Sequence, residues 1–262
     1  DLPQFDLITL HGIWSWVSDQ DRATILDLAR RYLAPGGLLY VSYNCASGWA
    51  AATSLRQLLL AHALQASPSE APATEKIEHA MQFAQGLADA GAAYFKANPT
   101  VVAQFRSVKG RNRTYLAHEF LGPHWHPMTF FEVATLMEAA GLEFVASTFL
   151  LEHGDRFTLN DSARKLLASI DQPVLREVAI ECFINPQFRQ DLFANQPTRL
   201  SPQERREGFR RQRFVLTTPV EAVSLTVPGP REPVVLDPVF YRPVLEVLAA
   251  RDYVAKCLGD IA

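Results

Sequence analysis

Two stretches decide the fold: FDLITLHG at residues 5–12 and PGGLLYVSYN at residues 35–44. Each contains a short apolar run that ends in polar residues or glycine, a pattern typical of buried parallel strands. Residues 18–33 repeat apolar side chains every three or four positions, which predicts a helix that begins at Ser18 or Asp19. The sequence therefore predicts a strand, a helix and a second strand, joined by a right-handed crossover as in nucleotide-binding α/β domains.

The next segment interrupts this sheet with helices. Residues 54–65 and 75–98 carry apolar side chains at helical spacing, and a stretch rich in serine and proline separates them. A strand pattern returns at residues 142–151, after a helix that begins at Thr129 with Glu132 in the capping-box position. We expect the intervening helices to form an insertion that lies over the carboxyl ends of the strands as a lid.

The remainder of the chain has a different pattern. Helical segments alternate there with short strand-like runs around proline and glycine, which predicts an α+β module. The predicted fold class is α/β: a partial Rossmann-like sheet with a helical insertion, followed by a mainly helical α+β C-terminal module. The expected segments are 1–50 for the half-sheet, 51–126 for the insertion, 127–153 for the closing helix and strand, and 154–262 for the C-terminal module.

The composition excludes several classes of protein. Of 262 residues, 48% are hydrophobic and 20% are charged, and a net charge of −3 argues against nucleic-acid binding through bulk charge. The three cysteines form no CxxC pair, which fits a reducing compartment. No apolar run approaches the ~20 residues of a membrane-spanning helix, and the first residues do not form a signal peptide. We expect a cytoplasmic protein that binds neither nucleic acid nor membrane.

Few residues group in a way that predicts chemistry. Neither GxGxxG nor GxxxxGK[ST] occurs, and Gly36-Gly37 follows a helix, where glycines end it and do not cradle phosphate. His118-Glu119, with His124 and His126, is the densest set of metal-ligand types, but it lacks the HExxH spacing. We expect no metal site there and interpret these residues as the polar border of a cleft. No catalytic residue can be assigned.

Two further features have alternative interpretations. Cys45, just past a strand, is either a nucleophile or a small packed thiol. Residues 202–213 carry five arginines, which form either a solvated helix face or a docking surface for an acidic partner.

Several stretches together resemble bacterial class I S-adenosylmethionine (SAM)-dependent methyltransferases that carry a methyltransferase regulatory domain. The similar stretches occur in the same order as in that family: HGIWSWV at 11–17, LAPGG at 33–37, YVSYN at 40–44, YLAHEFL at 115–121, PMTFFE at 127–132, GLEFVA at 141–146 and NPQFRQDL at 185–192. The APGG turn is generic to class I methyltransferases, whereas HGxxSWV together with YLxHEFL is specific. Relatives in this family include enzymes that methylate lysines of outer-membrane proteins.

The resemblance implies a site at the ends of the first two strands. His11, Gly12 and Trp14 would lie on the methyl-transfer side and contact the cofactor. The expected substrate-side rim consists of Tyr43, Asn44, Tyr115, His118 and Glu119. An aromatic ring such as that of Trp14 could favour the sulfonium of SAM by cation–π contact, although the ring could equally pack the loop onto the sheet.

The resemblance also implies what this chain lacks. In the family, SAM is held mainly by the first two strands, a glycine-rich turn and an acidic residue after the second strand. None of these is present in the sequence, so we expect no tight SAM binding and no activity by this chain alone. We therefore interpret it as a regulatory and partial catalytic fragment of a methyltransferase that acts on protein lysine. Alternatives are a non-catalytic substrate-docking module and a general protein-interaction scaffold. We also expect a homodimer, or another pairing, through the exposed edge of the first strand.

Overall fold

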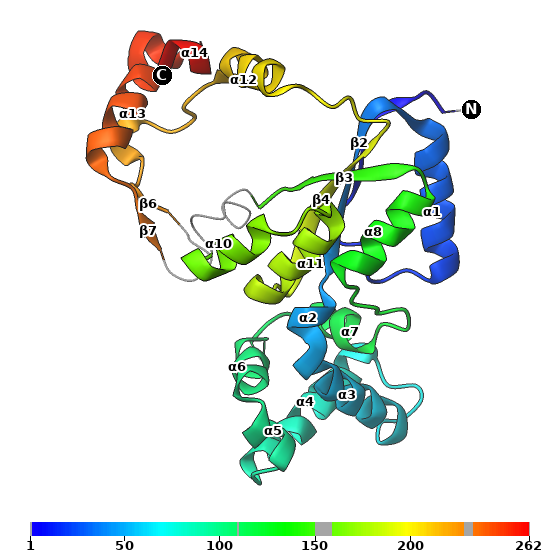
Figure 1. The fold of residues 1–262 in the computed structure, drawn as a ribbon. Coiled ribbons are helices and arrows are strands. Elements are labelled where there is room, and N and C mark those ends of the chain that lie inside the picture. Colours follow the sequence, from blue (N-terminus) through cyan, green and yellow to red (C-terminus); the bar gives the residue numbers. More distant parts are fainter. Residues whose placement is uncertain (1, 109, 150–158, 228–232, 262) are drawn as a thin grey trace. The chain divides into compact units, whose positions relative to one another are not determined.

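A computed structural model describes residues 2–108, 110–149, 159–227 and 233–261 (Figure 1). The chain divides into two compact units. The first unit comprises Asp1–Thr148 and Lys165–Gln196, and the second comprises Phe149–Arg164 and Pro197–Ala262. The expected boundary between residues 153 and 154 lies outside the described residues.

The first unit contains a four-stranded sheet and most of the helices. Its elements are β1 (Phe5–Leu10), α1 (Asp19–Tyr32), β2 (Leu33–Asn44), α2 (Ala46–Trp49), the 3-10 helix η1 (Ala50–Ala52), α3 (Thr53–Gln65), α4 (Ala73–Asp89), α5 (Ala93–Ala97), α6 (Pro99–Val108), α7 (Arg113–Leu121), α8 (Phe130–Ala139), β3 (Leu142–Ser147), α11 (Pro173–Ile184) and β4 (Phe188–Asn195). Helix α10 (Asp161–Ala168) crosses the boundary between the two units.

The second unit is built from short elements. They are α12 (Pro202–Arg211), β5 (Arg213–Phe214), η2 (Val220–Ala222), β6 (Thr226–Val227), β7 (Val234–Val235), α13 (Pro238–Tyr253), β8 (Lys256–Cys257) and α14 (Leu258–Ile261). β5 pairs with β8 and β6 pairs with β7, both in antiparallel fashion. The predicted α+β character of this region is confirmed.

The opening unit β1–α1–β2 has the predicted form. Strands β1 and β2 are parallel, from Leu7 opposite Leu38 to Leu10 opposite Val41. Helix α1 begins after Ser18, whose side chain accepts from the Asp21 N–H while the Asp21 side chain accepts from the Ser18 N–H, so a full capping box fixes its start. The α/β fold class predicted from the sequence is confirmed.

The sheet order is β1-β2-β4-β3, and one of its two central strands, β4, is the last of the four along the chain. β4 is antiparallel to β2, from Leu38 opposite Ala194 to Asn44 opposite Phe188, and is also antiparallel to β3. No strand was predicted at these residues, which were expected in the C-terminal module, whereas the structure makes β4 a central part of the first unit. β3 confirms the predicted strand over Leu142–Ser147.

One face of this sheet is covered by helices and carries the main core. Helices α1, α8 and α11 lie over this face (Figure 1). Their side chains pack against alternate residues of the strands. The centre of the core consists of large, fully buried side chains: Trp14, Leu39, Tyr43, Phe130, Met137 and Phe193. On the opposite face, Leu7 is 54% exposed and Val145 is 49% exposed. Apolar side chains of β1 and β3 are therefore exposed on this sheet.

The helical insertion follows the carboxyl end of β2 and has a core of its own. Leu55, Leu59, Ile77, Phe105 and Leu116 are among its buried residues, contributed by α3, α4, α6 and α7. The predicted helix over residues 75–98 is wrong as one piece: α4 ends at Asp89, and α5 begins at Ala93. Gly91 lies between them with a φ of +78°, a backbone conformation that glycine adopts readily and that breaks the helix.

Candidate functional site

The carboxyl ends of β1 and β2 meet at one edge of the sheet, beside the first residues of the insertion. The Gly12 N–H donates to the Ser42 Oγ at 2.7 Å, which ties the loop after β1 to β2. His11 Nδ1 lies 3.1 Å from the Tyr40 hydroxyl. Gly12 has a φ of +67°, a value at which a larger residue would be strained. His11 and Gly12 are exposed at this edge, as a ligand-contacting role would require.

Helix α7 brings the insertion to the same edge. Asn44 Nδ2 donates to Glu119 Oε1 at 3.4 Å, and the Asn44 N–H donates to the Ser15 Oγ at 2.8 Å. The ring of His118 lies 4.7 Å from that of Trp16, measured between centroids. Tyr115 interacts with the Glu119 carboxylate and is 44% exposed. The structure thus brings Asn44 together with Tyr115, His118 and Glu119, which follow it by about 70 residues in the sequence.

Glu119 is the electrostatic centre of this group. Its side chain is buried, with an exposed fraction of 6%, and burial raises the pKa of its carboxyl group, an effect that hydrogen bonds from Tyr115 and Asn44 oppose. Among the described residues no cation forms an ion pair with it. Arg56 attracts the carboxylate from a greater distance, but its Nη2 donates to the Gly122 carbonyl at 2.5 Å and its guanidinium lies over the Trp125 ring. A buried carboxylate without an ion pair, bordered by aromatic rings, is suited to a cationic ligand.

The raised pKa of Glu119 has a measurable consequence for stability. Because the folded-state pKa lies above the ordinary value of 4.5, the folded protein binds this proton more tightly than the unfolded chain does. The contribution of Glu119 to the free energy of unfolding therefore falls as pH rises through the folded pKa. Glu119→Gln removes the titration, so the variant should gain stability relative to the parent between pH 4.5 and pH 8, as measured by urea unfolding at both pH values.

Glu138→Gln provides the control, because it makes the same chemical change on an exposed side chain of α8. A gain of the same size in that variant would contradict the assignment of the effect to burial of Glu119.

Two other predicted site residues lie elsewhere. Trp14 is fully buried in the main core, and its ring packs on the helix-covered face of the sheet. Tyr43 is also fully buried, and its hydroxyl donates to Asp191 Oδ2 at 2.6 Å. Successive strand residues point to opposite faces, so Tyr43 and Asn44 cannot share one rim.

Tyr43 belongs to a buried charged network that the sequence pattern did not predict. Arg189 Nε lies 3.0 Å from Asp191 Oδ2, and Arg189 Nη2 lies 3.1 Å from Glu177 Oε2. The Arg189 guanidinium also lies 4.5 Å from the centre of the Phe130 ring. Burial, and then the charge of Asp191, raises the pKa of Tyr43 well above its ordinary value. The hydroxyl therefore keeps its proton and donates a hydrogen bond to Asp191. This network joins β2, β4 and α11 and is structural in character.

The remaining candidates from the sequence do not form a reactive site. Burial raises the pKa of the Cys45 thiol to about 12, which favours a packed thiol over a nucleophile. His124 and His126 are exposed loop residues. Within residues 2–108, 110–149, 159–227 and 233–261, no three side chains of His, Cys, Asp or Glu gather as a set of metal ligands.

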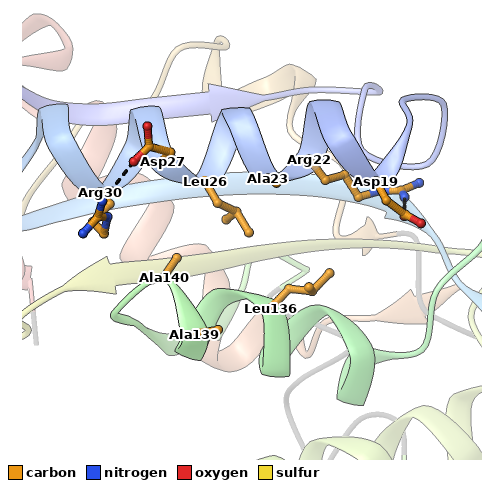
Figure 2. Close-up of a pocket in the computed structure, with 9 residues that line it drawn as sticks. All are labelled: Asp19, Arg22, Ala23, Leu26, Asp27, Arg30, Leu136, Ala139 and Ala140. Carbon is orange, nitrogen blue, oxygen red and sulfur yellow. Dashed lines mark hydrogen bonds and ion pairs between the residues drawn. The ribbon is translucent and has the colours of Figure 1, made fainter.

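A groove of about 390 Å³ lies between α1 and α8 (Figure 2). Leu26, Leu136 and Ala139 contribute apolar surface to it. The carboxylates at its border are already paired, Asp19 with Arg22 and Asp27 with Arg30, so the groove offers a ligand mainly apolar contact.

One family model matches part of this chain. Residues 112–195 match the family model described as a predicted methyltransferase regulatory domain. The matched residues run from α7 to β4 and therefore include Glu119 of the site and most of the charged network.

Two curated proteins are similar to this chain. An uncharacterized protein of Synechocystis sp., sll1526, is 37% identical over 248 residues, which cover 95% of this chain and 48% of that protein. An uncharacterized protein of Rickettsia prowazekii, RP028, is 26% identical over 124 residues, which cover 45% of this chain and 46% of that protein. The matches thus span about half the length of each relative.

Solved structures with the same fold include two of PKMT2 from Rickettsia typhi. One matches 99% of this chain and 51% of the PKMT2 chain, with a TM-score of 0.69 and 20% identity. The other, PKMT2 in complex with AdoHcy, matches 100% of this chain and 52% of its own, with a TM-score of 0.71 and 19% identity. The likeness shows that this chain shares its fold with about half of the PKMT2 chain.

Among the helices in the described part of the chain, none is both long and apolar enough to cross a bilayer.

Proposed function

We propose that this chain is the regulatory and partial catalytic part of a SAM-dependent methyltransferase that acts on protein lysine, and that it is inactive alone. The observation that carries the proposal is the regulatory domain over residues 112–195, whose helix α7 contributes a buried carboxylate to the ends of β1 and β2. The fold shared with PKMT2, a protein lysine methyltransferase solved with AdoHcy, supports both the cofactor and the acceptor.

The residues present suit one end of the cofactor. When bound, SAM supplies a methyl group on a positively charged sulfur. Glu119 is a buried carboxylate without an ion pair among the described residues. Tyr115 interacts with it, and the Trp16 ring lies against the neighbouring His118, so this edge can stabilise a positive charge. No glycine-rich phosphate or ribose motif occurs in the sequence, so grip on the rest of the cofactor must come from another polypeptide segment.

A lysine acceptor makes a second demand on the site. Its ammonium must lose a proton before the nitrogen can accept a methyl group, and an acid–base group with a raised pKa is suited to hold that proton. We assign this role to the Glu119 carboxylate, with the Asn44 amide and the Tyr115 hydroxyl fixing its orientation.

The open sheet supports the need for a second segment. Among the described residues, β1 pairs only with β2, so its other edge is free for another strand. This edge, with the exposed Leu7 of β1 beside it, is suited to pairing with the segment that grips SAM or with a second copy of the chain.

Calorimetric titration with SAM tests the proposal. We expect no tight binding by this chain alone, because it lacks the motif that holds the nucleoside. Binding should appear when the half of the Synechocystis relative outside its match is added as a separate polypeptide. Methylation of a lysine-containing protein should then follow, and Glu119→Gln should lower its rate by about 10²-fold or more.

The outcomes separate the alternatives. Tight SAM binding by the chain alone would contradict the assignment of the cofactor grip to another segment. Failure of the mixture to bind SAM, with sedimentation showing a stable complex of the two polypeptides, would favour the non-catalytic docking role.

A further inference from the structure

Helix α12 presents a positively charged face in a chain whose net charge is negative. Residues 202–213 contain five arginines and two glutamates, whereas the whole chain carries a net charge of −3. Arg205, Arg206, Phe209 and Arg210 fall within about 140° of one another on an α-helix of 3.6 residues per turn. We call these four residues the arginine face. All four are exposed, and Phe209 is 59% exposed.

The carboxylates of α12 do not neutralise this face. Glu204 is engaged in the capping box, where its side chain accepts from the Ser201 N–H at 2.8 Å. Glu207 accepts from Gln203 Nε2 at 3.0 Å. Within the described residues, no carboxylate lies at ion-pair distance from the three arginines of the face. By contrast, two exposed arginines of α1, Arg30 and Arg31, both contact Asp27.

The rest of the unit fixes the helix and leaves the arginine face outward. The capping box sets the start of α12, and the helix packs against α14, where Gly259 allows close approach to Arg210. The Leu258 N–H donates to the Gln212 carbonyl at 2.9 Å. The arginines are therefore held on a defined helix and not on a loose segment, which lowers the entropy lost when a partner binds.

We propose that the arginine face of α12 docks an acidic polypeptide segment that also carries apolar side chains. Guanidinium groups bind carboxylates through paired hydrogen bonds, and an exposed phenylalanine between them offers an apolar anchor. Arginine and aromatic residues are enriched where binding energy concentrates in protein interfaces. A patch of three arginines is small for a nucleic acid, whose affinity grows with the number of phosphates neutralised.

Fluorescence anisotropy with a labelled peptide of four Glu-Glu-Leu-Glu repeats tests the proposal on the intact chain. We expect saturable binding that weakens as salt rises from about 50 to 500 mM, because charge–charge contacts are screened. The same peptide with every glutamate replaced by lysine should not bind. Arg205→Gln combined with Arg206→Gln should weaken binding about tenfold, and Phe209→Ser should weaken it with less change in salt dependence.

Arg30→Gln combined with Arg31→Gln is the matched control, because it removes the same two charges from arginines that are already paired with Asp27. Binding in this variant should stay within about twofold of the parent. The proposal is overturned if the acidic peptide does not bind at low salt, if the control pair weakens binding as much as the α12 pair, or if single-stranded RNA or vesicles of anionic lipid bind more tightly than the peptide.

Discussion

Replacement of Arg189 by leucine is expected to lower the free energy of unfolding by about 3–5 kcal/mol, because it removes the guanidinium that two buried carboxylates contact. Asp191 is fully buried and Glu177 is nearly so, and both contact the guanidinium. Burial alone would disfavour the charged guanidinium, but Asp191 and Glu177 raise the pKa of Arg189, so the guanidinium keeps its charge in the core. Urea unfolding followed by circular dichroism measures the loss.

Arg30→Leu is the control for this prediction. Arg30 pairs with Asp27 on the exposed side of α1, where an ion pair contributes less than about 1 kcal/mol. If Arg189→Leu lowered the free energy of unfolding as little as Arg30→Leu, the network of Arg189, Asp191 and Glu177 would not stabilise β4 as its geometry indicates.

Trp14→Ala is expected to cost about 3–5 kcal/mol of folding free energy, because it removes the largest side chain of the main core and leaves a cavity. Trp14 is fully buried, whereas Trp16 is only partly buried and stacks on His118. Trp16→Ala should therefore cost much less. Thermal unfolding of the two variants in parallel measures the difference.

Trp14→Phe separates packing from hydrogen bonding. The Trp14 Nε1 has no hydrogen-bond partner among the described residues, so phenylalanine loses volume but no bond. We expect it to recover most of the stability lost in the alanine variant. A phenylalanine variant as unstable as the alanine variant would show that the indole does more than fill the core.

The strand–helix–strand opening could be predicted because its information is local. Apolar runs, a capping box at Ser18 and a helix between them lie within residues 5–44, and the pairing of β1 with β2 follows from that order. The break between α4 and α5 was within reach as well, since Gly91 marks it, but apolar side chains continue at helical spacing on both sides.

β4 could not be found by the same means. Its buried face carries Arg189 and Asp191 beside Phe193, so the alternation of apolar and polar residues that marks a strand is absent. Those two charges are tolerated because Glu177, on α11, and Tyr43, on β2, complete the network. Such partners are recognised only after the chain has folded, because Tyr43 lies 148 residues from Asp191.

The candidate site was predictable in part. Asn44, Tyr115, His118 and Glu119 were proposed for one rim, and the structure brings these four side chains together. Tyr43 was proposed beside Asn44, but the period of a strand sends adjacent side chains to opposite faces, and that rule was available from the sequence. The pairing of Trp16 with His118 depends on how α7 crosses the strand ends, which no local pattern encodes.

The late position of β4 affects how the protein is made. A ribosome adds β1 and β2 about a hundred residues before β3, yet β3 pairs with β4 and not with either of these earlier strands. Until Asn195 has emerged from the exit tunnel, β3 has no neighbour among the described strands and β2 has only one. The nascent sheet therefore carries unpaired backbone and apolar side chains through most of synthesis of the first unit, a period in which chaperones would protect it from aggregation.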